Sequence, residues 1–375
     1  MNKFNFLLIG NILLIFIISS CGNQIINNPI NKNSQEISSI HLNTQSIFNK
    51  RIEIQIYSSY GNEEEVFIKG RVLKEKKISP SSPDDSSLKN LWRTIQLLES
   101  DEIKNISLDI NFNGKNIKTK TDKEGHFDLK IKDFGSIKPG YNKVTATLSP
   151  NQDKHYICNI STGLITIQLK NDTTFGIISD IDDTIQISNV TKKVNFIKNI
   201  FFGNYTTQQK VKGTPELYQI LDKKSDGNID GDIYYLSCSP VNLYPRIEGF
   251  LRFNNFPLGS IDLKKLGFRE EDDSLFEQVK YKTKKIKTLL ETYPNKKFLC
   301  FGDSGEKDPE IYKQIDKEFP GRILGIYINN VTNENKNSPR FQGTVLTNNT
   351  IEAGIDLFQK NLITNEDLEI IKQAS

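Results

Sequence analysis

The sequence predicts an α/β domain, with a parallel sheet and helices on both faces, preceded by a smaller β-sandwich domain. From residue 173 onward, apolar strand-like runs alternate with helical patterns, which is typical of a parallel sheet. Residues 50–172 instead contain short alternating runs separated by turn residues, which favours a sandwich of immunoglobulin-like shape. Acidic and polar side chains follow several apolar runs of the second half, so we expect the chemistry there.

Residues 1–21 are expected to be a signal peptide outside the fold. A lysine precedes a largely apolar stretch, residues 4–18, and a sequence resembling a bacterial lipoprotein cleavage box ends at Cys21. Cys21 would be the lipidation site, and we expect a lipid-anchored protein of the cell envelope, on the outer membrane or periplasmic face. The alternative, an uncleaved membrane helix, is disfavoured because the apolar run is short and interrupted by Gly10 and Asn11.

Residues 22–49 are rich in Asn, Ser and Gln and predict a flexible tether. A stretch with prolines and aspartates, residues 79–87, predicts a surface loop within the β-domain. A strand–turn–strand is predicted from Lys118 to Ile131. Further strands are predicted over Arg51–Tyr57, Glu65–Val72, Ser107–Phe112, Val144–Leu148 and Leu164–Leu169.

Composition bounds the function. The 375 residues leave room for about two domains. The 49 basic and 46 acidic residues nearly balance, and without a basic stripe nothing points to a nucleic-acid partner. Beyond Cys21 there are three cysteines, an odd number that does not form a disulfide framework, and their spacing is not that of zinc ligands.

The most informative stretch, Gly176–Thr184, is an apolar β-branched run that ends in three carboxylates and a threonine. Acids at this spacing repel one another unless a cation lies among them. Asp180 and Asp182 point to the same side of a strand, so the first can attack an electrophile while the second lends a proton. These acids therefore predict Mg²⁺ at the carboxyl end of a parallel strand. The alternative is that the acids only cap a turn.

Three further polar sets follow along the chain. A second apolar strand, Ile233–Pro240, contains hydroxyl residues at its end, a helix is predicted from Lys282 to Tyr293, and a third apolar strand runs into Asp303 and Asp308. Ligands of open α/β sheets bind at the carboxyl ends of the strands. A hydroxyl and a lysine there can hold phosphoryl oxygens while the acids bind metal. Each set alone also fits a helix cap, a solvated helix face or a loop.

The pattern Asp180-x-Asp182-x-Thr184 resembles motif I of the haloacid dehalogenase superfamily, and the second half of the chain resembles the APP-type phosphatidate phosphatases of that superfamily. The resemblance implies a haloacid-dehalogenase-like Rossmannoid catalytic domain over residues 173–375, with a small cap insert at about 185–232. It also implies magnesium-dependent conversion of phosphatidic acid to diacylglycerol and phosphate. The similar stretches are Asp180–Ile185, Leu236–Pro240 with Leu243–Pro245, Phe256–Gly259, Gly302–Gly305 with Asp308–Tyr312, and Pro320–Ile323 followed by Ile326–Ile328.

The same resemblance implies roles for individual residues. Asp180 resembles the nucleophile and Asp182 the general acid and base. Ser237 resembles the catalytic hydroxyl of motif II, with Ser239 as its rival, and Lys282 the lysine of motif III. The implied metal ligands are Asp180, Asp182, Asp303 and Asp308, and the implied substrate-binding residues are Thr184, Ser239 and Gly302.

Two alternatives remain at the level of sequence. Because the motifs read only a phosphoryl group, a phosphomonoesterase acting on soluble phosphate esters fits as well as a phospholipid phosphatase. A surface binding module with an inactive phosphatase fold is disfavoured, because no motif carboxylate is missing. Basic and aromatic residues in the insert, including Phe201 and Phe202, suggest contact with a lipid surface; a core-facing helix with solvated lysines is the alternative.

Overall fold

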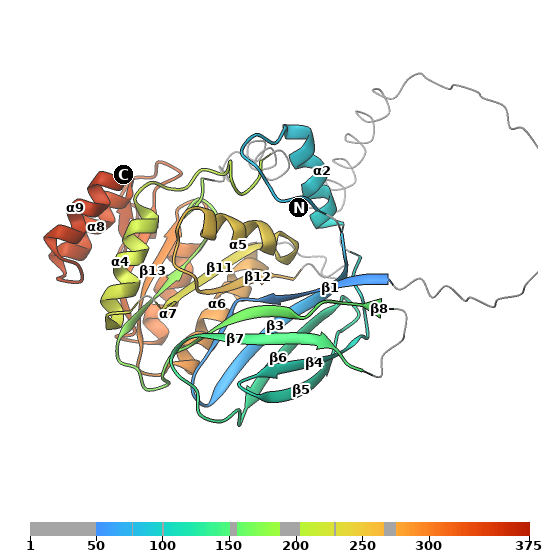
Figure 1. The fold of residues 1–375 in the computed structure, drawn as a ribbon. Coiled ribbons are helices and arrows are strands. Elements are labelled where there is room, and N and C mark those ends of the chain that lie inside the picture. The colour runs from blue at the N-terminus through green and yellow to red at the C-terminus, as the bar shows by residue number, and fades with distance from the viewer. Residues whose placement is uncertain are drawn as a thin grey trace, which may run out of the picture.

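The structure is a computed structural model that describes residues 50–76, 78–99, 101–150, 156–187, 203–228, 230–265 and 275–375. The expected signal peptide with Cys21, the tether at 22–49, and Phe201 and Phe202 lie outside the described residues. Two sheets, one of nine strands and one of six, organise the described chain (Figure 1). No helix in these ranges combines the length and apolarity needed to cross a bilayer.

The nine-stranded sheet is mixed and lies in the first half of the chain. Its strand order is β5-β4-β7-β9-β2-β3-β1-β8, and β6 pairs with β3. Burial alternates along β4, where Leu108, Ile110 and Phe112 face a common apolar core while the residues between them are partly exposed. The strands are β1 (Lys50–Tyr57), β2 (Ser59–Gly61), β3 (Glu65–Lys74), β4 (Ser107–Phe112), β5 (Lys115–Lys120), β6 (His126–Lys132), β7 (Gly140–Leu148), β8 (Tyr156–Ile157) and β9 (Ser161–Ile167).

The predicted strand–turn–strand forms two strands that do not pair with each other. Strand β5 pairs antiparallel with β4, whereas β6 pairs antiparallel with β3. Asn113 and Gly114, with φ of 50° and 77°, form the tight turn between β4 and β5. Two successive residues with positive φ match the twist of a two-residue hairpin, so this Asn-Gly pair sets the pairing of β5.

Helix α2 (Ser87–Leu98) contradicts the expectation of β structure throughout this half. The Ser86 side chain caps it by accepting a hydrogen bond from the Lys89 amide. Its buried residues are polar, while Leu88 and Trp92 are exposed. Leu88 and Trp92 therefore form an exposed apolar pair on α2, whereas Leu98 at its end packs against the core of the catalytic half.

The six-stranded sheet is parallel throughout, in the order β12-β11-β10-β13-β14-β15. Strand order reverses at β10, the first of the six in the chain, and such reversals create the ligand-binding crevice of open α/β sheets. The acids after β10 and at the end of β13 therefore meet at this crevice. The strands are β10 (Phe175–Ser179), β11 (Ile233–Pro240), β12 (Ser260–Lys264), β13 (Lys297–Asp303), β14 (Ile323–Asn329) and β15 (Val345–Thr347).

Helices cover both faces of the parallel sheet. Ile177 of β10 shares a core with α4, α5, α8 and α9, whereas its neighbour Ile178 shares another with α6 and α7. Helix α4 lies within the predicted cap insert but packs in the first core, so it belongs to the layered fold. The helices are α4 (Thr214–Asp226), α5 (Tyr244–Phe253), α6 (Leu275–Thr292), α7 (Asp308–Glu318), α8 (Thr350–Gln359) and α9 (Asn365–Ala374), with short turns η1 (Val241–Leu243) and η2 (Pro339–Phe341).

The two sheets are joined by specific contacts. The Ile261 amide donates to the Ser58 carbonyl at 3.1 Å, and the Tyr293 hydroxyl donates to the Gly61 carbonyl at 2.7 Å. The Asp262 carboxylate accepts from Lys69 at 2.8 Å and from Lys285 at 2.6 Å. Burial opposes ionisation of Asp262, but the two ammonium groups outweigh it and hold its pKa well below the usual range. The first half of the chain is thus fixed against β12 and α6.

Candidate active site

Asp180 follows β10 directly and is 1% exposed. Its amide donates to the Phe301 carbonyl at 2.9 Å, which ties it to β13. Its Oδ1 accepts from Lys282 Nζ at 2.8 Å and its Oδ2 accepts from Thr184 Oγ1 at 3.1 Å. The structure therefore brings together the expected nucleophile, the expected lysine and the expected threonine of motif I.

Lys282 is the centre of the acidic cluster. It lies within α6, which begins at Leu275 and so starts upstream of the predicted helix. Its ammonium group is 1% exposed and donates to Asp180 at 2.8 Å, to Asp308 at 2.7 Å and to Glu306 at 2.8 Å. An ammonium has three N–H donors, so all of them have carboxylate partners. Glu306 was given no role from sequence, although it follows Asp303 by three residues in the same acidic stretch.

The carboxylates of Asp180, Asp303 and Asp308 offer oxygens that lie within 4.8 Å of one another. Asp303 Oδ1 accepts from the Gly305 amide at 2.6 Å, but Asp303 Oδ2 is buried without a hydrogen-bond partner among the described residues. A buried carboxylate oxygen without a donor is costly. Oxygen donors of this kind are the ligands of Mg²⁺, so the residues fit the expected ion. The Asp182 carboxylate, also expected to bind metal, is not in this group.

Burial shapes the charge of the cluster. It raises the pKa of Asp180 and of Asp303 well above the usual carboxyl range, and neighbouring carboxylates add to the shift. Burial also raises the pKa of Glu306. For Lys282 burial acts in the opposite direction, but the surrounding carboxylates outweigh it and raise the pKa well above 10.5. The positive charge of Lys282 alone therefore cannot neutralise all the carboxylates of the cluster, and a bound cation would neutralise the remaining negative charge.

Magnesium should stabilise the protein more at high pH than at low pH. Because folded Asp180 and Asp303 keep protons that unfolded carboxylates release, the free energy of unfolding of the metal-free protein falls as pH rises above about 4. We expect Mg²⁺ to raise the melting temperature by about 5 °C near pH 8 and by much less near pH 5, measured by calorimetry. Sodium chloride at equal ionic strength is the control. An equal shift at both pH values, or none, would contradict the metal site.

Asp182 lies on the hydroxyl side of the site. Its Oδ2 accepts from Ser239 Oγ at 2.7 Å and from Ser237 Oγ at 3.1 Å, and its Oδ1 accepts from Gln186 at 2.7 Å. Ser237 Oγ also accepts from the Ser239 amide at 2.9 Å. The hydroxyls of Ser237 and Ser239, at the end of β11, thus both contact the expected general acid. Both stay candidates for the motif II hydroxyl.

Two arginines near the site have no role in the sequence prediction. Burial lowers the pKa of Arg246, a partly exposed residue, to about 10, and the charge of Asp182, the expected general acid, opposes this shift. Arg340 donates to the Ser304 carbonyl at 2.7 Å and to the Glu306 carbonyl, and so braces the acidic loop. Nothing in their sequence neighbourhood distinguishes them from surface arginines.

Gly302 leaves space for the side chain of Asp308, an expected metal ligand. A Cβ at this position would lie 2.5 Å from Asp308 Cβ and 2.6 Å from Asp308 Oδ2. The structure therefore gives Gly302 a packing reason, whereas its expected role was substrate binding.

Gly302→Ala should weaken metal binding without changing the nucleophile. The added methyl group must displace Asp308, an overpacking that costs about 1–3 kcal/mol. We expect the magnesium concentration for half-maximal activity to rise about tenfold, measured by titration. Gly343→Ala is a matched control, because its Cβ would meet no atom within 4 Å, although its backbone φ of 82° makes that variant mildly strained. An unchanged magnesium requirement in Gly302→Ala would contradict the assignment of Asp308 as a ligand.

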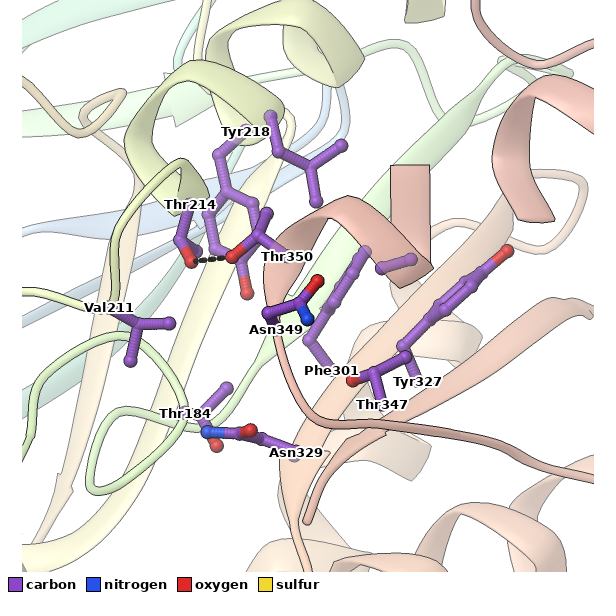
Figure 2. A pocket seen from close by; sticks show the side chains of 13 residues that line it. Thr184, Val211, Thr214, Tyr218, Phe301, Tyr327, Asn329, Thr347, Asn349 and Thr350 are labelled. Atoms are coloured by element: carbon purple, nitrogen blue, oxygen red, sulfur yellow. Dashed lines mark hydrogen bonds between the residues drawn. The ribbon is translucent and has the colours of Figure 1, made fainter. Parts of the chain in front are cut away.

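Two cavities border the site. The first lies behind Thr184, where Thr214 and Thr350 hydrogen-bond across α4 and α8 at 2.9 Å (Figure 2). Its volume of about 30 Å³ holds one or two water molecules and excludes a phosphate ester. The second, of about 260 Å³, lies between α2 and α5 and is lined in part by Arg93 and Arg246.

Comparisons with known proteins match the segment that contains this site. Residues 175–330 match the family described as phosphatidate phosphatase APP1, catalytic domain, and they contain every catalytic and metal-binding residue predicted from motifs. Phosphatidate phosphatase APP1 of Saccharomyces cerevisiae is 33% identical over 180 residues, which cover 47% of this chain and 30% of that protein. An uncharacterised protein of Schizosaccharomyces pombe is 26% identical over 219 residues, covering 57% of this chain and 34% of that protein.

The chain therefore spans about a third of the length of these curated relatives. Among solved structures, a 1.5-MDa bacterial ice-binding adhesin aligns with 36% of this chain and 40% of that chain, at 12% identity and a TM-score of 0.20. The family match covers β10 through β14 together with the acidic cluster. Residues 175–330 are therefore similar to the catalytic domain of the APP-type phosphatidate phosphatases.

Proposed function

We propose that this protein is a magnesium-dependent phosphatase that hydrolyses phosphatidic acid to diacylglycerol and phosphate. The observation that carries the proposal is the placement of the Asp180 carboxylate between Lys282 and the acids Asp303 and Asp308, within the segment that matches the family. The parallel sheet with helices on both faces supports a haloacid-dehalogenase-like fold for the catalytic part. The shared apolar core of the mixed sheet supports a sandwich over residues 50–172.

The proposed reaction has two steps. The Asp180 carboxylate attacks phosphorus, the bond from phosphorus to the glycerol oxygen breaks, and Asp182 gives its proton to the leaving alkoxide. Asp182 then takes a proton from a water molecule that attacks the aspartyl-phosphate, and phosphate leaves Asp180 unchanged. Hydrogen bonds from Ser237 and Ser239 orient the Asp182 carboxylate for both transfers.

Lys282 and the acids provide the electrostatic part. Lys282 holds Asp180 at 2.8 Å and places a positive charge where phosphoryl oxygens develop negative charge. A magnesium ion held by Asp180, Asp303 and Asp308 would add positive charge at the same place. Burial of the cluster strengthens both interactions, because water does not screen them.

The proposed substrate also fits the expected location of the protein. We propose that lipidation at Cys21 ties the chain to a membrane of the cell envelope, with residues 22–49 as the tether. A lipid anchor would hold the catalytic part close to phospholipid headgroups. The residues of the site would contact only the phosphoryl group of a substrate. The test must therefore distinguish hydrolysis of phosphatidate from hydrolysis of soluble phosphate esters.

The test compares substrates at fixed magnesium. Phosphate release by the full chain is measured with phosphatidate in mixed micelles and with a panel of soluble phosphomonoesters, with and without a chelator. We expect a preference for phosphatidate that the chelator abolishes. A preference for a soluble ester would support the proposed reaction mechanism but reject the lipid substrate. A folded protein that releases no phosphate from any of the substrates would reject the phosphatase.

A further inference from the structure

Helix α2 exposes its apolar side to solvent. Leu88 and Trp92, one helical turn apart, are 74% and 62% exposed. The opposite side, with Asn90, Arg93 and Thr94, is buried against the protein. A surface helix of a globular protein normally buries its large apolar side chains, so the exposed pair Leu88 and Trp92 calls for a partner that it contacts.

The orientation of α2 is fixed by polar contacts. Arg93 donates to Asp85 and to Asn90, each at 2.9 Å. Asn204, from the catalytic half of the chain, donates to Asn90 at 2.9 Å, and Asn242 of η1 donates to the Leu98 carbonyl at 3.2 Å. Turning the apolar side inward would break these hydrogen bonds and bury unpaired polar groups, so the exposed side is the stable one.

The helix lies beside the carboxyl end of the parallel sheet. Asn242, which contacts α2, follows β11 and its two site hydroxyls directly. Between α2 and α5 lies the cavity of about 260 Å³, which has Arg93 on the α2 side and Arg246 on the α5 side. Arg246 is in turn the guanidinium beside Asp182. A surface that covers α2 would therefore border the catalytic crevice.

The chain enters the described fold next to α2. The Glu75 amide donates to the Arg51 carbonyl at 3.0 Å near the start of β1, and the adjacent Lys76 donates to the Gln96 carbonyl of α2 at 2.9 Å. The start of β1 thus lies close to the end of α2.

We propose that α2 docks on the surface of a phospholipid bilayer, with the Leu88 and Trp92 side chains at the level of the headgroups. This rests on the proposed function, because phosphatidate is a bilayer lipid. Tryptophan and leucine on one side of a helix are typical of interfacial helices. The helix itself carries Lys89 and Arg93 and no acidic residue.

The chain offers a built-in probe for this proposal, because Trp92 is its only tryptophan. Emission of the full chain is recorded with vesicles of phosphatidylcholine and phosphatidylglycerol, which contain no phosphatidate. We expect a blue shift on adding vesicles and quenching by brominated acyl chains. Leu88→Ser should raise the lipid concentration at half-shift about tenfold. The double variant Ile355→Ser with Phe358→Ser, which removes an exposed apolar pair from α8, should leave it unchanged.

The N-terminal segment is present in all variants, so binding through it does not distinguish them. If the protein floats with vesicles while Trp92 emission stays unshifted, α2 does not touch lipid and the proposal fails. A blue shift that grows with protein concentration in the absence of vesicles would assign the apolar side to a second copy of the chain and also overturn it.

Activity separates this proposal from the proposed function. Leu88→Ser combined with Trp92→Ser should lower turnover of phosphatidate in vesicles about tenfold and leave turnover of dispersed short-chain phosphatidate unchanged. Equal turnover of vesicle substrate by this variant and the wild type would overturn docking while the phosphatase stands. Lipid insertion of Trp92 in a chain that hydrolyses neither substrate would reject the proposed function and support docking.

Discussion

Asp180→Asn is expected to fold normally and to lose about 10⁴-fold or more of its turnover. The amide keeps the shape of the carboxylate: its oxygen can still accept from Lys282, and its NH2 group can donate to the Thr184 hydroxyl. The amide oxygen is, however, a poor nucleophile. Because burial raises the pKa of Asp180, a neutral side chain there relieves an unfavourable charge, and stability should not fall. Phosphate release at saturating magnesium and thermal unfolding measure the two effects.

Asp183→Asn is the matched control for this variant. Asp183 is a buried carboxylate in the same stretch, and its φ of 57° is a backbone conformation that Asn adopts readily. We expect it to retain turnover within about tenfold, because it removes a charge near the site but no attacking group. Retained turnover in Asp180→Asn would reject the nucleophile, and equal losses in both variants would show that charge alone matters.

Lys282→Met is expected to cost both stability and activity. The variant leaves the buried carboxylates of Asp180, Asp308 and Glu306 without their shared cation, and removal of one partner of a buried ion pair typically costs about 3–5 kcal/mol. Turnover should fall at least about 100-fold, because a positive charge facing the phosphoryl oxygens is lost. Urea unfolding near pH 8 without magnesium and initial rates with magnesium measure the two losses.

The pH dependence and a control on the same helix make this prediction specific. Because the pKa values of Asp180, Asp303 and Glu306 are raised above the usual carboxyl range, these groups gain protons sooner as pH falls, and the stability loss should shrink towards pH 5. Lys280→Met removes an ammonium that is 68% exposed, and should change stability by less than about 0.5 kcal/mol. A Lys282→Met protein as stable as the wild type near pH 8 would contradict the account of the cluster.

The core of the site was accessible from sequence because its signals are local. An apolar run followed by acids marks the end of a buried parallel strand, and β11 spans Ile233–Pro240 as predicted. Strand ends of one parallel sheet meet at one edge, so Asp180 and Asp303 could be placed together without knowing any loop. Lys282 could be placed only through the family resemblance, because its neighbours resemble a solvated helix face.

Other features depend on long-range packing that no local pattern encodes. The contact of Glu306 with Lys282 depends on how the loop after β13 folds under Arg340. The exclusion of the Asp182 carboxylate from the metal group follows from the hydroxyls of β11, which compete for it. Helix α2 is different, because its apolar residues Leu88, Leu91 and Trp92 do recur at helical spacing; the short alternating runs on either side of it dominated the prediction of β structure.

The most direct test of the account is the location of the phosphoryl group during turnover. Phosphatidate labelled with ³²P is mixed with the full chain and magnesium, the reaction is stopped in acid within milliseconds, and the label is mapped to a peptide. The account predicts label on the peptide that contains Asp180, and none in Asp180→Asn. Steady turnover with no label on the protein, or with label on another residue, would contradict it.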